Sequence, residues 1–341
     1  MAARVMANTN VTGCAWHRSQ DPRCLFGRWQ YGNSIILDSL LYASTFVPGV
    51  NASGFVDERL NSWLRDGNSS AFNISHNISR RPVGFGAVPD LYPFVYLSQA
   101  EYHRQHDTSG FSNATALLVS RVGANDIVAW PKLWTDGLLT RDDEHASAAE
   151  CWRGGPLQKD GGMKAACVWS DDATMALTPV SRAVAAAVTT PPVRATWRAW
   201  LGKQHSLYAK HLQDTDGLFY HGQDASVRQH SCCKWSRANG WMMTAHVEVL
   251  SALENISNAP AENQRDDFAV ALAIFRSHAA AIATVQSADG RFYNLLNDSS
   301  TWLETSGTAM FSHSIAVGVM NGWLERYGVD HVHARVASGI S

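Results

Sequence analysis

The chain repeats one sequence unit at an almost constant interval. Three tryptophan-led segments, residues 169–175, 235–241 and 302–311, begin 66 and 67 residues apart, and each runs into an apolar stretch. An Asp-Gly-x-Phe-Tyr signal precedes the second segment at residues 216–220 and the third at residues 289–293. Such a unit predicts repeated helical hairpins whose polar loops recur at the same relative place. Stacked or closed in a ring, the hairpins would bring a carboxylic acid, a guanidinium and several indoles to one face, a layout suited to binding sugars.

Helical periodicity dominates the chain, and its sequence shows no convincing alternating strand. Hairpins of roughly 55–70 residues would fit five or six times, which favours an all-α (α/α)6 barrel over an open solenoid. We expect a single domain over residues 1–341, with the first ~25 residues an incomplete or extended arm. Pro179 is expected to kink or break one of the helices. The predicted helices span residues 29–46, 90–102, 171–188, 193–212, 238–253, 265–286 and 305–327.

Composition narrows the possible partners. The net charge of −2 offers no basic field for nucleic acid, and no apolar run reaches the ~18 residues of a membrane span. A Trp-rich core and an indole-lined cleft explain the 13 Trp equally well, except in the motif segments, where polar neighbours favour the cleft. No Cys-x-x-Cys pair has matched ligands, so neither a metal nor another cofactor is expected. The predicted partner is an oligosaccharide, and the chain is expected to be a monomer or a homodimer.

Glycosylation signals favour a secreted, extracellular protein. Eight of the seventeen Asn residues stand in Asn-x-Ser/Thr sequons, where chance would give about two or three. Six Cys agree with an oxidising compartment; Cys232 and Cys233 are adjacent and are not expected to pair with each other. Residues 1–15 lack the apolar core of a signal peptide, so we expect an incomplete N-terminus or a gene model that starts late. The sequons are at Asn10, Asn51, Asn68, Asn73, Asn77, Asn113, Asn255 and Asn297.

Two carboxylates are candidates for proton transfer. Asp171 lies between Trp169 and Asp172, at the start of a helix that turns apolar within two residues. A carboxyl group in such surroundings suits a general acid, and the alternative is a helix N-cap. Asp90, at the start of another aromatic-rich helix, is the candidate second carboxylate, and as a lone residue it too reads as an N-cap.

Two cationic side chains are candidates for binding substrate. His221 follows a Phe-Tyr pair and precedes a Gly; it could bind a carboxylate or a sugar hydroxyl, or be an ordinary structural histidine. Arg237 lies between Trp235 and Trp241, and its planar fork suits a uronate carboxylate. The alternative for Arg237 is a helix-start residue bonded to backbone carbonyls. Because Arg237 and Trp241 are four residues apart, they are predicted to share a helix face, with Trp241 the stacking surface.

Together the motifs resemble the signature segments of a known enzyme group. Residues 169–175 (Trp-Ser-Asp-Asp-x-x-Met), 219–224 (Phe-Tyr-His-Gly-x-Asp), 235–241 (Trp-Ser-Arg-Ala-Asn-Gly-Trp) and 303–311 (Leu-Glu-Thr-Ser-Gly-Thr-Ala-Met-Phe) are similar to those of the unsaturated glucuronyl and rhamnogalacturonyl hydrolases, glycoside hydrolase families 88 and 105. The similarity is clear over residues 169–327 and weaker over residues 29–90.

This resemblance implies an (α/α)6 barrel and a metal-free reaction on oligosaccharides whose non-reducing end is a 4,5-unsaturated uronic acid. The C4=C5 bond is protonated, water adds at C5, and the hemiketal collapses to release the neighbouring sugar. Asp171 maps onto the proton donor and water activator, and Asp90 onto the second carboxylate. The substrate-binding residues expected from the motifs are Trp169, His221, Trp235, Arg237, Trp241 and Thr305.

Some positions depart from the family pattern. Residues 161–167 read Gly-Gly-Met-Lys-Ala-Ala-Cys and lack the His that often stands there, and Asp172 follows Asp171. These departures bear on substrate preference and, to a lesser degree, on activity. They leave two alternatives open: a glycan-binding pseudoenzyme, and another barrel enzyme such as a lyase or an epimerase. An epimerase needs paired histidines, and only His221 stands in a motif.

Overall fold

The structure of the chain is a computed structural model. It describes residues 167–185, 191–224, 229–254 and 262–325, with isolated positions between residues 35 and 55. Contacts divide the chain into two compact units, Met1–Gly137 with Ala186–Thr189, and Leu138–Ala185 with Thr190–Ser341. In the first unit, residues 35, 36, 39, 40 and 43 are helical, within the helix predicted at 29–46. The helix predicted at 90–102, and Asp90 with it, lies outside the described residues.

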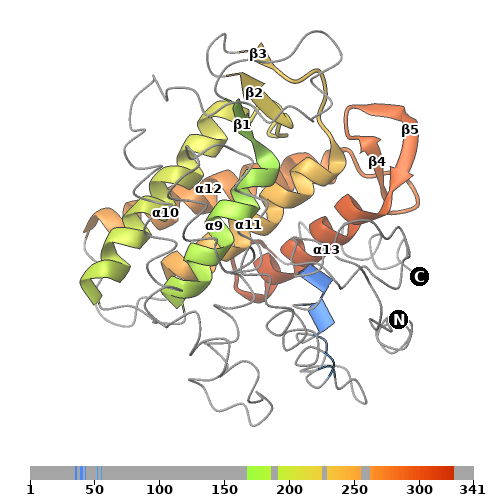
Figure 1. Ribbon diagram of the computed structural model, residues 1–341. Helices are drawn as coiled ribbons and strands as arrows, with labels where there is room; N and C mark the ends of the chain where they lie inside the picture. The colour runs from blue at the N-terminus through green and yellow to red at the C-terminus, as the bar shows by residue number, and fades with distance from the viewer. Residues whose placement is uncertain are drawn as a thin grey trace, which may run out of the picture. The chain divides into compact units, whose positions relative to one another are not determined.

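The described part of the second unit is a bundle of helices with α11 at its centre. Helix α11 lies between α9 and α13 and also packs against α10 and α12 (Figure 1). The five helices predicted beyond residue 170 are confirmed, with ends shifted by a few residues. The largest shift is in α13, which ends at Met320 because the chain turns at Gly322 with a φ of 71°. The helices are α9 (Ser170–Ala185), α10 (Pro191–Leu212), α11 (Ser236–Glu254), α12 (Glu262–Thr284) and α13 (Thr305–Met320).

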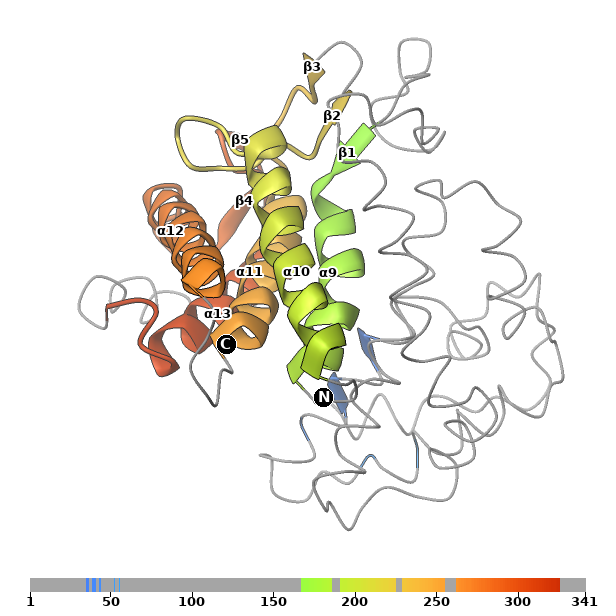
Figure 2. The same cartoon turned by 90° about the vertical axis from the view of Figure 1, so that its left-hand side faces the viewer.

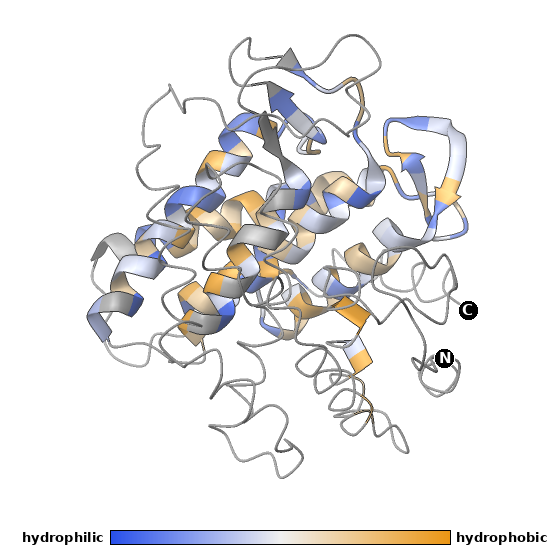
Figure 3. Cartoon of the chain, viewed as in Figure 1, coloured by the Kyte–Doolittle hydropathy of each residue, from blue (hydrophilic) through white to orange (hydrophobic). Residues whose placement is uncertain are grey.

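Helix α11 is central because small residues let its neighbour come close. A Cβ on Gly240 would lie 2.8 Å from Met310 Sδ, and a Cβ on Gly307 would collide with Ser236 Oγ. Both contacts join the first two turns of α11 and α13, so the beginnings of these helices are held side by side. Figure 3 shows hydrophobic residues along the middle of the bundle and hydrophilic residues on the outer face of α10.

Five short strands correct the expectation of purely helical structure. Strands β1 (Cys167–Trp169), β2 (Gly222–Asp224) and β3 (Gln229–His230) form an antiparallel sheet in that order, and β4 (Phe292–Leu295) pairs with β5 (Asp298–Glu304). Most are too short to show alternation in sequence. Both sets of strands lie toward the end of the bundle where α9 and α11 begin (Figures 1 and 2). A bridge from Trp235 to Leu295 joins the start of α11 to β4.

Two further expectations meet the structure in the helices. Pro179 neither ends nor interrupts α9, which is continuous over Ser170–Ala185, so the predicted break is wrong. Among the described helices, Asp266–Thr284 of α12 is long and apolar enough to cross a membrane by length and composition alone. This finding differs from the expectation that no stretch is long enough. Only 33% of that window is buried, although His278 within it is completely buried.

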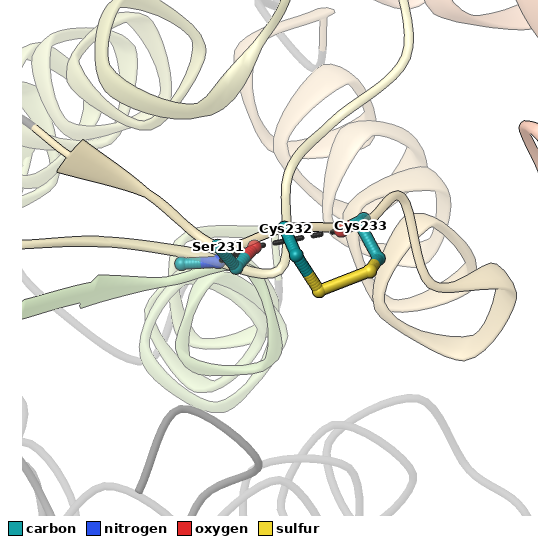
Figure 4. The surroundings of a disulfide bond; sticks show 4 residues. Ser231, Cys232 and Cys233 are labelled. Atoms are coloured by element: carbon teal, nitrogen blue, oxygen red, sulfur yellow. Dashed lines mark hydrogen bonds between the residues drawn. A yellow bond between two sulfur atoms is a disulfide. The ribbon is translucent and has the colours of Figure 1, made fainter. Parts of the chain in front are cut away.

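The chain makes a tight turn between β3 and Trp235. There Cys232 and Cys233 form a disulfide bond between adjacent residues (Figure 4), so the expectation that they would not pair is wrong. The turn places both side chains on the same side of the backbone, and Ser231 Oγ donates to the carbonyl oxygen of Cys233 at 3.4 Å. The bond closes the turn just before the second tryptophan-led motif.

Candidate active site

The start of α9 is tied to the segment that carries His221. Strand β1 pairs with β2 so that Trp169 stands opposite Gly222. The backbone N–H of Ser170 donates to the carbonyl oxygen of His221 at 2.9 Å, and Ser170 Oγ donates to the same oxygen at 2.9 Å. Two segments some fifty residues apart are thereby fixed next to each other, with Asp171 immediately after the joint.

Asp171 and His221 meet at this joint. His221 Nε2 lies 3.4 Å from Asp171 Oδ1, and the two side chains are 6% and 30% exposed. Asp171 Oδ1 is itself buried and accepts no hydrogen bond within the described part of the chain. A carboxyl group beside an imidazole, partly open to solvent, can give a proton to a bound molecule and take one back.

Trp235 forms a wall next to this pair. The His221 ring packs edge-on against the Trp235 ring with centroids 5.0 Å apart, and the Arg237 guanidinium carbon lies 4.8 Å from the Trp235 ring centre. Trp235 Nε1 donates to Asn294 Oδ1 at 3.1 Å, which fixes the indole against β4. Imidazole, indole and guanidinium therefore follow one another in contact.

Arg237 is anchored on one edge only. Its Nε donates to Ser306 Oγ at 2.9 Å, and its Nη2 lies 3.6 Å from Glu304 Oε1. The side chain is 44% exposed, and within the described residues neither Nη atom donates a hydrogen bond. Glu304 is 8% exposed and caps α13 through the backbone N–H groups of Ser306 and Gly307. The guanidinium is thus oriented, yet its Nη atoms can still bind an anion.

The other predicted site residues are placed less directly. Trp241 is only 9% exposed, and its carbonyl oxygen accepts a hydrogen bond from Thr174 Oγ1. The ring in contact with Arg237 is that of Trp235, not Trp241. Thr305 is exposed and opens α13 directly after Glu304. The Trp169 side chain and the whole of Asp90 lie outside what the structure describes.

Several polar residues of the site escaped the sequence analysis. Glu304 stands in a motif, but Glu is not a usual N-cap residue, so nothing marked its double role at α13 and Arg237. Asn239, in the second motif, is completely buried and carried no assigned role. Lys234 binds Asp214 Oδ2 at 2.6 Å and also Asp216; no pattern links residues about twenty apart in a loop.

Electrostatics distinguish this Lys234 cluster. Hydrogen bonds from Lys234, Tyr220 and the Thr215 backbone hold the pKa of Asp214 well below its usual range. Burial works against the charge of Lys234, but the hydrogen bonds to its two carboxylates outweigh it and raise its pKa. Hydrogen bonding to Asp214 raises the pKa of the Tyr220 hydroxyl. The cluster is a charged clamp beneath the loop that leads to His221.

In the described ranges, no group of three or more His, Cys, Asp or Glu side chains is arranged to hold a metal ion. The chemistry available from the described site is that of a carboxyl group, an imidazole, a guanidinium and an indole.

A helical bundle that gathers a carboxyl group, an imidazole, an indole and a guanidinium where α9 and α11 begin is an arrangement typical of a helical-barrel enzyme. Residues 133–338, more than half of the chain, match the profile of Glycosyl Hydrolase Family 88, and the chain belongs to this family. The protein is therefore a glycoside hydrolase.

Solved structures support the fold. A possible member of family 105 from Salmonella enterica is 19% identical with a TM-score of 0.63, covering 99% of this chain and 79% of that one. An unsaturated glucuronyl hydrolase from a Bacillus species, responsible for degradation of glycosaminoglycan, is 13% identical with a TM-score of 0.56, covering 99% and 81%. A protein described as a polysaccharide lyase is 14% identical with a TM-score of 0.59, covering 98% and 82%. The (α/α)6 barrel prediction is confirmed by these likenesses.

Proposed function

We propose that the protein hydrolyses oligosaccharides, of rhamnogalacturonan, pectin or a related uronide type, that end in a 4,5-unsaturated uronic acid, and releases that terminal residue. The observation that carries the proposal is the sequence of contacts from Asp171 through His221 and Trp235 to Arg237. It sets a proton donor, an aromatic surface and a carboxylate-binding cation along one stretch of the site. The family membership and the activity of the similar Bacillus protein, an unsaturated glucuronyl hydrolase, support the same reaction class.

In the proposed reaction Asp171 donates its proton to C4 of the double bond. The cation that forms at C5 is stabilised by the ring oxygen, and water adds to C5 while returning a proton to the Asp171 carboxylate. The resulting hemiketal opens to a ketone at C5, and C1 becomes an aldehyde as the neighbouring sugar leaves with its hydroxyl group restored. Asp90, which lies outside the described residues, is proposed as the second carboxylate.

Arg237 is proposed to bind the uronate carboxylate. Its Nε donates to Ser306 Oγ and its Nη2 lies in ion-pair range of Glu304, but in the described part of the chain neither Nη atom donates a hydrogen bond, so both can be offered to a carboxylate. His221, Trp235 and Trp241 are proposed to contact the sugar, as are Trp169 and Thr305. Of these, His221 and Trp235 already touch each other.

The direct test uses lyase-generated unsaturated disaccharides and follows the ultraviolet absorbance of the conjugated double bond. Hydrolysis predicts that the absorbance is lost as the free sugar appears. A rise in absorbance on an intact polysaccharide would instead show a lyase, an outcome that the structural likeness to one makes worth measuring. Saturable binding without turnover would show a glycan-binding pseudoenzyme.

Arg237 provides the sharper test. Wild type is expected to discriminate strongly against the methyl ester of the uronide, whereas Arg237→Ala should not. The mutation should raise the Michaelis constant more than it lowers turnover, because carboxylate binding is shared by ground and transition states. We expect a loss of about tenfold or more in kcat/KM, typical of a charged hydrogen bond, with Arg237→Lys restoring only part of it. If Arg237→Ala retains the full preference for the free acid, the carboxylate is bound elsewhere.

We also propose that the protein is secreted and N-glycosylated. Asn297 of one sequon is exposed in the turn between β4 and β5, where a glycan would project into solvent. The disulfide bond between Cys232 and Cys233 supports an oxidising compartment.

A further inference from the structure

Three completely buried histidines form a line of hydrogen bonds through the bundle. His205 of α10 lies with its Nε2 2.6 Å from Nδ1 of His246, in α11. Nε2 of His246 lies 3.1 Å from Nδ1 of His278, in α12. His278 Nε2 lies 3.0 Å from Oδ1 of Asn239, at the start of α11. All four side chains are 0% exposed, and none takes part in the proposed chemistry.

Asn239 determines the direction of the whole line. Its Nδ2 donates to the carbonyl oxygens of Phe219 and Trp235, both at 2.9 Å. Its Oδ1 accepts the backbone N–H of Phe219 at 2.8 Å. An amide oxygen only accepts, so His278 must donate to it from Nε2.

The remaining protons follow from this one. Burial lowers the pKa of His278 to about 3 and of His205 to about 4, and that of His246 well below its ordinary value, so all three rings are neutral at neutral pH. A neutral imidazole has one N–H, and His278 Nδ1 is therefore an acceptor for His246 Nε2–H. By the same step His246 Nδ1 accepts from His205 Nε2–H. Each ring carries its proton on Nε2.

Asn239 binds backbone groups of the two segments that carry His221 and Trp235. It binds both backbone groups of Phe219, two residues before His221, and the carbonyl of Trp235, whose indole packs on the His221 ring. The Phe219 ring also packs on His278, with centroids 4.6 Å apart. Two neighbouring walls of the site, which carry His221 and Trp235, are thus joined at one amide.

We propose that Asn239 is a positioning residue for His221 and Trp235, and that the line His278–His246–His205 holds its amide in place through the hydrogen bond from His278. If the amide turned over, its NH2 group would face the Phe219 N–H and its oxygen would face two carbonyls. These three backbone groups exclude that state, and the N–H on His278 Nε2, whose position they determine, gives the amide oxygen a second donor. The distance from His221 to Asp171 is set through this device, so the kinetic part of the inference rests on the proposed function.

The first experiment needs no substrate. Nitrogen-15 NMR of the histidine rings in the intact wild-type protein should show three rings with the proton on Nε2 that do not titrate between pH 6 and 8. A proton on Nδ1 of His278, or titration of His278 in this range, would overturn the inference.

The second experiment compares substitutions within α12. His278→Phe keeps a ring against Phe219 and removes the donor, His278→Gln keeps an N–H donor, and Arg276→Met is the matched control. Arg276 lies two residues before His278 on the same helix and donates to the carbonyl oxygen of Trp323. It has no contact with Asn239. The His221 ring signal should shift in His278→Phe, return toward the wild-type position in His278→Gln, and stay in place in Arg276→Met.

Turnover provides the third readout. His278→Phe should lower kcat roughly tenfold or more with KM changed less, as expected for misplacement of a reacting group. His278→Gln should recover most of the loss, and Arg276→Met should retain wild-type kcat. If His278→Phe does not fold, the Gln variant and the wild-type spectra still decide. Equal kcat in His278→Phe and Arg276→Met, or an unmoved His221 signal, would refute the positioning role, whereas absence of turnover in wild type would refute only the proposed reaction.

Discussion

The two Asp-Gly-x-Phe-Tyr turns of the protein have the same backbone and different surroundings. Gly217 and Gly290 have φ of 86° and 87°, values that favour glycine. Asp216 Oδ1 accepts the N–H of Leu218 at 2.9 Å, and Asp289 Oδ1 accepts the N–H of Arg291 at 3.1 Å. The repeated sequence therefore encodes a repeated turn.

The repeat extends to the helix that follows each turn. Phe219 and Phe292 are both 0% exposed. The N–H of Phe219 donates to Asn239 Oδ1 in α11, and the N–H of Phe292 donates to Thr308 Oγ1 in α13, at 2.8 and 3.2 Å. In each repeat, a polar side chain from the first turn of the next helix accepts the hydrogen bond of a buried backbone N–H. Leaving that N–H without an acceptor would cost free energy of folding.

The difference lies in what each turn is bound to. In the first, Lys234 is 5% exposed and clamps Asp214 and Asp216, and Asn239 continues into the histidine line. In the second, Asp289 pairs with Arg291, and the two side chains are 45% and 41% exposed. The first turn leads to His221 in the site, whereas the second stands at the surface. Buried partners, rather than the turn itself, therefore distinguish the first turn from the second. The segments after the second turn still support the site, because Asn294 binds the Trp235 indole and Ser306 binds Arg237.

The largest expected contrast is in the response to acid. Because burial lowers the folded-state pKa of His205, His246 and His278, the unfolded chain binds more protons as pH falls below ~6.5. Stability should therefore fall between pH 6.5 and about 4, by up to ~1.4 kcal/mol per pH unit for each histidine. The lowered pKa of Asp214 acts later: its contribution is present above about pH 4 and is lost below it. Urea unfolding at pH 7.0, 5.5 and 4.5 measures this, and equal midpoints at all three would contradict it.

The next largest contrast is expected in turnover, between a substitution close to the first Asp-Gly-x-Phe-Tyr turn and one in the second turn. Asp171 lies beside His221, which follows the first turn. Asp171→Asn is expected to lower turnover by at least ~100-fold, the usual size of general acid catalysis, with substrate affinity changed far less. Asp289→Asn, in the second turn, should leave turnover unchanged. Steady-state kinetics on an unsaturated disaccharide measure both. If Asp172→Asn loses turnover and Asp171→Asn keeps it, the motif is assigned one residue out of register.

A stability comparison tests the two ion pairs directly. Lys234→Met leaves two carboxylates without their cation and should cost about 2 kcal/mol, less than a fully buried pair because both carboxylates are partly exposed. Arg291→Met removes a surface pair and should leave the free energy of unfolding unchanged within error. Chemical denaturation of the two variants beside wild type measures the difference. Equal losses would show that exposure does not distinguish the two turns.

The sequence alone predicted much of this arrangement, and what it missed has two physical causes. Helical periodicity predicted the five helices, and the motifs placed Asp171, His221, Trp235 and Arg237 as a group, because turns and helix starts depend on local chemistry. It missed the Lys234 clamp and the histidine line because those contacts join residues about 20 to 40 apart on different elements. The Cys232–Cys233 bond was missed because adjacent cysteines pair only when the backbone turns tightly between them, and no residue pattern indicated such a turn.

The smallest effect is expected at the tip of the β4–β5 hairpin, which follows the second Asp-Gly-x-Phe-Tyr turn. Asn297 and Ser299 of the sequon are exposed, whereas residues 214–236, which contain the first Asp-Gly-x-Phe-Tyr turn, include no sequon. Ser299→Ala removes the acceptor signal while retaining Asn297 in its turn. After expression in a eukaryotic secretory host, its mass should fall by one glycan, with stability within about 0.5 kcal/mol of wild type, as for surface substitutions away from special features, and with unchanged turnover. An unchanged mass would show that this turn is not glycosylated, and a loss of turnover would show that the tip of this hairpin takes part in the site.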